Sequence, residues 1–168
     1  SASGLPQWVS WYNPKPLKIS KLFFKGHGSG NIGNFIVQAS NDNKSWIDIT
    51  SYSNTNKTGD FEVELPENAG LYQYWRLYIT SCYYGSYPLI AYGFRIIAQT
   101  QVTVIKEAET VDLSKNKYWK YAYEPWEQPV LTSDTSSDEI TLSASSNYGG
   151  GYDMYKAFDN STSTGWLS

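Results

Sequence analysis

Apolar and polar residues alternate along most of the chain with the period of two that is typical of β-strands. Residues 61–65, Phe-Glu-Val-Glu-Leu, show this alternation most clearly. Further strands are predicted at residues 8–12, 17–24, 34–40, 46–49, 74–80, 90–97, 101–105, 118–123 and 140–146. In residues 17–24 the apolar positions change phase between Ile19 and Leu22, which predicts a β-bulge. No amphipathic helix is predicted before residue 99.

Turn-forming residues separate these strands. Asn13-Pro14 predicts a turn after the first strand, and the Asn-Asp-Asn-Lys run at residues 41–44 predicts a tight turn. Gly-rich and Tyr-rich loops are predicted at residues 26–31 and 83–88, because neither segment could build a core. Residues 106–120 are charged and polar, so they read as part of a connector spanning residues 100–130.

Composition fits one folded β domain over residues 1–168. Aromatic residues make up 17% of the chain, a content that disordered chains lack. The net charge of −3 argues against a protein that binds the nucleic-acid backbone. Cys82 is the single cysteine, so it is predicted to be a free, buried thiol. No apolar run is long enough to span a membrane, and no signal-peptide pattern opens the chain.

Nothing in the sequence matches a catalytic pattern. His27 is the only histidine, and it lies in a Gly-rich loop. No nucleophile elbow, zinc-protease or phosphate-loop motif is present, and no carboxylates form a recognisable acid–base pair. We therefore expect a protein that binds and is not an enzyme.

The C-terminal stretch resembles the opening of a discoidin, or F5/8 type C, module. Residues 157–166, AFDNSTSTGW, resemble the family motif A-F-D-G-N-x-S-T-x-W, and a Gly/Tyr-rich loop precedes them as in the family. The N-terminal stretch resembles what should follow: PQWV at 6–9, PLKI at 16–19 and FIVQASNDNKSW at 35–46. The closing strands of the family resemble YWRLYI at 74–79 and IAYGF at 90–94.

Both parts of the module are thus present in circularly permuted order. Residues 131–168 resemble its N-terminal part, residues 1–99 its C-terminal part, and residues 100–130 the connector. The chain could be a natural or engineered permutant, a slice of a tandem array, or a product of processing. The resemblance implies a galactose-binding-like, CBM32-like, jelly-roll β-sandwich of two antiparallel sheets. Trp8, Trp46, Trp75 and Trp166 fall at strand positions and are predicted to lie in its core.

The resemblance also implies a structural Ca²⁺ site. By matching position, its oxygen ligands would come from Lys156, Asp159, Ser161, Thr164 and Ala91. Ser161 stands where the family often has Asn, and Tyr92 stands where it often has an acidic ligand. The alternative is that Asp159 only caps its own turn.

A ligand-binding end is implied by the same family. Loops at one end of the sandwich bind sugars, lipid head groups or protein epitopes in its members. Here those loops offer tyrosine rings as platforms, from Tyr83, Tyr84, Tyr87, Tyr148 and Tyr152. Polar partners would be Lys25, His27 and Asn31, and sugar binders of the family often place an Arg where this loop has Lys25 or His27. The alternative is that several tyrosines only cover the end of the sandwich.

These features predict a carbohydrate-binding or host-surface attachment module of an extracellular bacterial protein or phage tail fibre. Its partner would be a glycan or another cell-surface ligand, and its location extracellular, at a cell surface or on a virion. One alternative is a structural or self-assembling repeat whose halves complete each other between chains, as a homo-oligomer or with a tandem-repeat neighbour. The other is an accessory domain of a glycoside hydrolase.

Overall fold

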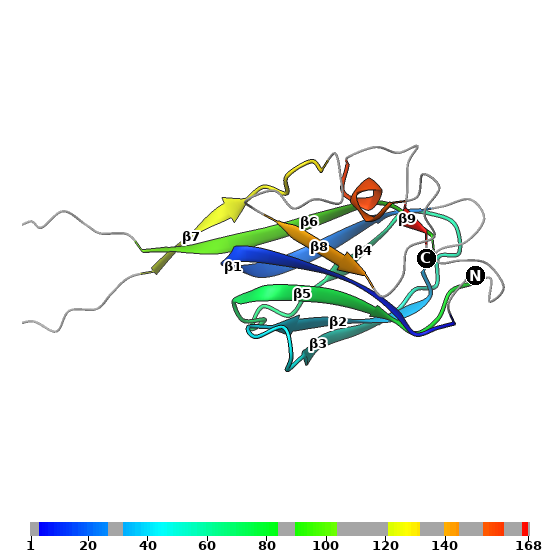
Figure 1. Ribbon diagram of the computed structural model, residues 1–168, viewed down its shortest axis with the longest axis horizontal. Helices are drawn as coiled ribbons and strands as arrows, with labels where there is room; N and C mark the ends of the chain where they lie inside the picture. The colour runs from blue at the N-terminus through cyan, green and yellow to red at the C-terminus, as the bar shows by residue number, and fades with distance from the viewer. Residues whose placement is uncertain are drawn as a thin grey trace, which may run out of the picture.

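The fold is all-β and antiparallel, as expected (Figure 1). The computed structural model describes residues 4–26, 32–83, 90–103, 121–131, 140–144, 153–159 and 166–167. Its elements are β1 (Gln7–Lys25), β2 (Asn34–Ser40), β3 (Ile47–Ser53), β4 (Phe61–Glu64), β5 (Tyr72–Ile79), β6 (Ile90–Thr103), β7 (Tyr121–Trp126), β8 (Thr141–Ala144), the 3₁₀ helix η1 (Met154–Ala157) and β9 (Trp166–Leu167).

The long strand β1 belongs to both layers of a sandwich. Up to Tyr12 it pairs with β5 on one side and β8 on the other, which gives the sheet order β8-β1-β5-β2-β3. From Leu17 onward it pairs with β6 and β4, and β6 also pairs with β7 and β9. The first sheet, β8-β1-β5-β2-β3, is called the front sheet below, and the sheet built on β6 is called the back sheet.

Residues 13–16 carry β1 from one sheet to the other. The predicted turn at Asn13-Pro14 is not a separate turn, because the backbone stays extended and only the pairing register shifts between Tyr12 and Leu17. Two prolines suit such a crossover, since their fixed φ is compatible with extended backbone and they offer no N–H to a ladder. The side chain of Asn13 accepts from Lys15 N at 3.0 Å and Gln73 Nε2 donates to Pro14 O at 2.8 Å, which fixes the crossover.

The predicted bulge lies at Ser20. Its neighbours Ile19 and Lys21 pair with Ala98 and Ile97, which are adjacent in β6, so Ser20 is the extra residue. The bulge moves the buried positions of β1 from odd to even numbers, and its carbonyl accepts from Leu65 N at 2.9 Å. The predicted β-bulge is therefore confirmed, and it accounts for the phase change between Ile19 and Leu22.

The core lies between the two sheets. Trp11 of the front sheet contacts Phe94 of the back sheet at 5.4 Å between ring centres, and Phe24 of the back sheet contacts Phe35 of the front sheet at 5.4 Å. Trp75 is fully buried, as predicted. Burial of each such side chain stabilises the fold by about 1.5–3 kcal/mol. Cys82 forms no disulfide and packs beside this core, but it is only partly buried and not fully buried as predicted.

Other predicted elements are found with shifted bounds. The turn at 41–44 is confirmed, with Asn43 at φ 56°. Strand β3 begins at Ile47 and runs to Ser53, and β6 runs through to Thr103, so it includes the start of the separate strand predicted at 101–105. The predicted aromatic edge strand is β7, shifted toward Trp126. Residues 104–120, most of the predicted connector, lie outside the described part.

Within one chain, the C-terminal segment joins the N-terminal segment. Strand β8 pairs with β1 through Trp11 and Leu142, and β9 pairs with β6 through Ala91 and Trp166. The chain ends, Ser1 and Ser168, lie outside the described residues. Among the described residues, no helix has the length and apolar character needed to cross a membrane.

Candidate functional site

The loops singled out in the sequence leave the strands at one end of the sandwich, on the right in Figure 1. Ile79, at the end of β5, lies opposite Gln7 at the start of β1. Ala144, at the end of β8, lies opposite Val9. We call this end, with the described residues Lys25, Gly26, Asn54–Asp60 and Tyr83, the loop end.

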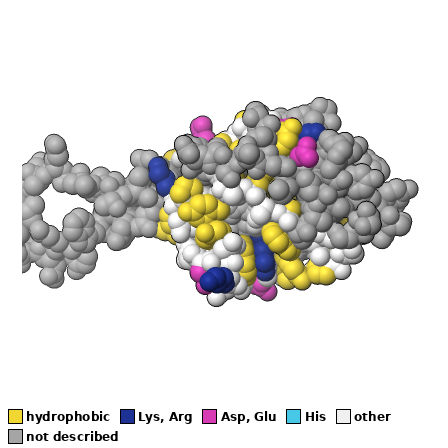
Figure 2. Space-filling view, viewed as in Figure 1, with side chains coloured by type: hydrophobic (Ala, Val, Ile, Leu, Met, Phe, Trp, Pro, Cys, Tyr) yellow, Lys and Arg dark blue, Asp and Glu magenta, His cyan; other side chains and the backbone are white. Residues whose placement is uncertain are grey.

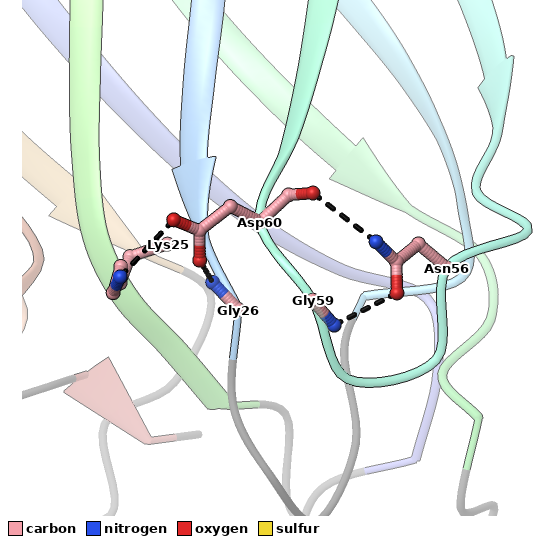
Figure 3. Close-up of polar contacts among 5 residues, drawn as sticks. All are labelled: Lys25, Gly26, Asn56, Gly59 and Asp60. Carbon is pink, nitrogen blue, oxygen red and sulfur yellow. Dashed lines mark hydrogen bonds and ion pairs between the residues drawn. The ribbon is translucent and has the colours of Figure 1, made fainter.

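Asp60 ties together two chain segments at the loop end (Figure 3). Its carboxylate accepts a hydrogen bond from Gly26 N at 2.8 Å and another from Lys25 Nζ at 3.0 Å. The Gly26 N–H and then the Lys25 ammonium lower the pKa of Asp60 below its usual value. Lys25, predicted as a polar partner of the ligand, is therefore engaged in an ion pair that fixes the start of the loop after β1.

The backbones at Gly26 and Gly59 approach each other closely. A Cβ on Gly26 would lie 2.3 Å from Gly59 C and 2.5 Å from Thr58 O. Glycine is therefore required at residue 26, because the opposing atoms belong to the backbone and cannot rotate away. This contact fixes how closely the chain after β1 approaches residues 58–59.

Two asparagines brace the segment that carries Asp60. Asn56 Oδ1 accepts from Gly59 N at 2.7 Å, and Asn56 Nδ2 donates to Asp60 O at 3.1 Å (Figure 3). Asn54 is buried, and its Nδ2 donates to Ile32 O at 2.8 Å. Each amide replaces a backbone partner that these turns lack, so side chains hold the loop end in one conformation.

Tyr83 is held by this same frame. Its hydroxyl donates to the carbonyl of Asn54, and the Lys57 ammonium lies 5.9 Å from the centre of its ring. The side chain is half-buried. Tyr83 is thus oriented by the loop end, and Lys57 adds an exposed cation that sequence reasoning did not select.

The other predicted ligand residues lie outside the described part of the chain: His27, Asn31, Tyr84, Tyr87, Tyr148 and Tyr152. Their part in ligand binding stays a prediction. What the structure adds is the frame that borders two of their loops, at residues 27–31 and 84–87.

Two of the five predicted Ca²⁺ ligands, Lys156 and Ala91, lie on elements that contact each other, and a third, Asp159, follows η1. Helix η1, which contains Lys156, contacts both β6 and β9, and Ala91 of β6 pairs with Trp166 of β9. Lys156 N donates to Asp153 O at 3.1 Å, and Asp159 follows the buried Phe158, which contacts Phe94 at 5.3 Å. Ser161 and Thr164 lie outside the described residues, so the Ca²⁺ site stays a prediction.

Within the described ranges, no three His, Cys, Asp or Glu side chains lie together in a way that could hold a metal ion. A site of the expected kind would use one carboxylate with carbonyl and hydroxyl oxygens, which are ligands that Ca²⁺ accepts.

The sequence reasoning missed a set of side chains on the outer surface of the front sheet. We call it the outer aromatic face, and its members are Trp8, Tyr12, Trp46, Tyr74, Arg76 and Tyr78. Trp8 and Trp46 were predicted to lie in the core, and this was wrong, since both are only half-buried. Alternation in β5 could have revealed the face, because Tyr74, Arg76 and Tyr78 must point away from the buried Trp75 and Leu77. The Trp166 side chain lies outside the described residues.

No protein-family model matches the chain, and no curated protein matches it. Among solved structures, the chain is similar to a Bacteroides thetaiotaomicron protein described as "putative chitobiase, fragment 298-461". The identity is 21% and the TM-score 0.39, over 49% of this chain and 53% of that chain. The chain thus spans about half the length of that structure, and similarity at this level does not establish a shared family.

Proposed function

We propose that the chain is a non-catalytic carbohydrate-binding or surface-attachment module of the discoidin type, in circularly permuted order, which binds its ligand at the loop end. The permuted order is supported by the pairing of β8 with β1 and of β9 with β6 within one chain. In this proposal residues 131–168 supply the opening of the module and residues 1–99 its remainder.

The observation that carries the proposed function is the braced loop end. The Asp60, Asn56 and Asn54 side chains hold the backbone on either side of residues 27–31. The Tyr83 hydroxyl, just before residues 84–87, donates to the carbonyl of Asn54 in the same segment. Binding sites formed by loops on a rigid sandwich are common, because a fixed frame reduces the entropy lost on binding. Tyr83 and Lys57 place an aromatic ring beside a cation. In a sugar site the ring would pack against the sugar, and the ammonium would donate hydrogen bonds to its hydroxyls.

The experiment is a glycan array probed with the labelled chain, followed by titration of the best glycan. We expect His27→Ala and Tyr84→Ala each to weaken binding by about tenfold or more, which corresponds to about 1.4 kcal/mol. Tyr74→Ala is the matched tyrosine control on the outer aromatic face, and it should bind this glycan like the wild type. The proposal fails if no glycan binds, or if neither loop variant changes the affinity.

A further inference from the structure

The outer aromatic face has a layout distinct from the loop end. Trp8 lies opposite Tyr78, and Tyr12 lies opposite Tyr74 with 4.6 Å between ring centres. Figure 2 looks onto this side and shows hydrophobic side chains spread over the described strands, with Lys or Arg side chains among them. Aromatic residues grouped on one exposed sheet face mark an interaction surface more often than chance, since soluble proteins avoid large apolar patches.

A polar row crosses the middle of this face. Asp48, Gln38, Arg76 and Ser10 lie opposite one another on successive strands, from β3 to β1. Arg76 Nε donates to Gln38 Oε1 at 2.6 Å, and Gln38 Nε2 donates to Asp48 Oδ1 at 2.6 Å. The row is therefore ordered, with each amide and carboxylate group holding the next.

Aromatic rings and Gln38 hold the Arg76 side chain in place, but no described carboxylate contacts its guanidinium directly. Its guanidinium lies 4.1 Å from the centre of the Trp46 ring and 5.6 Å from that of Tyr78. Within the described part of the chain, no carboxylate forms a salt bridge with it, and its two Nη groups donate no hydrogen bond. Burial lowers the pKa of Arg76, and Tyr78 and then Asp48 partly oppose that effect. A planar guanidinium of this kind suits a bidentate carboxylate.

We propose that the outer aromatic face binds an acidic polysaccharide, with a uronate carboxylate on the Nη groups of Arg76 and sugar rings on the flanking tyrosine and tryptophan rings. Charge complementarity selects the acid, and the aromatic rings select a ligand with flat C–H faces. The polar row favours a glycan over a second copy of this chain. An apolar dimer interface would desolvate Gln38 and Asp48, whereas sugar hydroxyls can hydrogen-bond to them.

This inference is independent of the proposed function at the loop end, and the test separates the two. The probe is polygalacturonate, embedded in native gels for affinity electrophoresis and titrated as short oligogalacturonides by calorimetry. The wild type should be retarded by polygalacturonate and much less by a neutral galactan. Arg76→Gln should lose about tenfold or more in affinity, because it removes the charged donor of the hydrogen bonds to the carboxylate. Tyr74→Ala should also bind more weakly.

Arg95→Gln is the matched control, because Arg95 is an exposed arginine on β6 of the back sheet, 5.4 Å from the Phe23 ring centre. It removes the same charge and should leave binding unchanged. The inference is overturned if the wild type is not retarded, if both arginine variants lose equally, or if the neutral galactan binds as well. It is also overturned if His27→Ala alone abolishes polygalacturonate binding, which would place the acid at the loop end. Light scattering that shows a dimer dissociated by Arg76→Gln would assign the face to a second copy instead.

Discussion

Replacing Gly26 with alanine should strain the contact that shapes the loop end. The new Cβ would lie 2.3 Å from Gly59 C, 2.4 Å from Gly59 O and 2.5 Å from Thr58 O. Ordinary carbon contacts begin near about 3.5 Å, so the two backbone segments must separate by roughly 1 Å. That movement also lengthens the 2.8 Å hydrogen bond from Gly26 N to Asp60. Overpacking of this kind costs about 1–3 kcal/mol.

Urea unfolding and thermal melting of Gly26→Ala measure this cost. For a chain of this size, a loss of about 1–3 kcal/mol lowers Tm by about 2–12 °C. Gly4→Ala is the matched control, because a Cβ at Gly4 meets no atom within 4 Å. Both changes reduce the entropy of the unfolded chain equally. If Gly26→Ala is as stable as Gly4→Ala, the close approach of residues 26 and 59 is not the constraint described here.

Three further results are expected. Backbone N–H groups of Ser45 and then Lys44 lower the pKa of Asp42 from its ordinary 3.8. The ionised carboxylate therefore stabilises the fold fully above pH 3.8, and this stabilisation is lost as the pH falls below it. The Tm advantage of the wild type over Asp42→Asn should shrink between pH 5 and pH 3; an unchanged advantage would refute this. Gln128→Ala removes the bonds to Ile96 N (2.7 Å) and Phe94 O (2.9 Å), and should destabilise by about 1–3 kcal/mol in urea unfolding. Gln99→Ala, at an exposed position, should leave the free energy of unfolding unchanged. Equal losses of stability in the two variants would contradict the role given to Gln128. Calcium should raise the Tm of the wild type but not of Asp159→Ala; equal melting curves with and without calcium would remove the cation site.

The strand pattern could be predicted because alternation is a local property of the sequence. The alternation in residues 61–65 correctly predicted β4, and the phase change between Ile19 and Leu22 correctly predicted the bulge at Ser20. The continuity of β1 could not be predicted, since Asn13-Pro14 has the composition of a turn. Only the presence of two sheets, each with a partner strand for one part of β1, keeps residues 13–16 extended.

The candidate site could be predicted only in outline. Loop composition selected Lys25 and Tyr83, but their roles depend on Asp60 and Asn54, which are distant in sequence and carry no motif. Trp46 was assigned to the core because it fell at a strand position of the predicted strand 46–49. Its place beside Arg76 depends on the registers of β2 with β3 and with β5, which local patterns do not fix.

Binding of ligand at the loop end can be observed residue by residue in an amide NMR titration of the ¹⁵N-labelled chain with the best glycan from the array. We expect the largest shift changes at Gly26, Gly59 and Tyr83 and in the segments that follow them. Amides of the outer aromatic face, such as that of Arg76, should change little with a neutral glycan. Shift changes confined to that face, or no changes with any array glycan, would contradict the account.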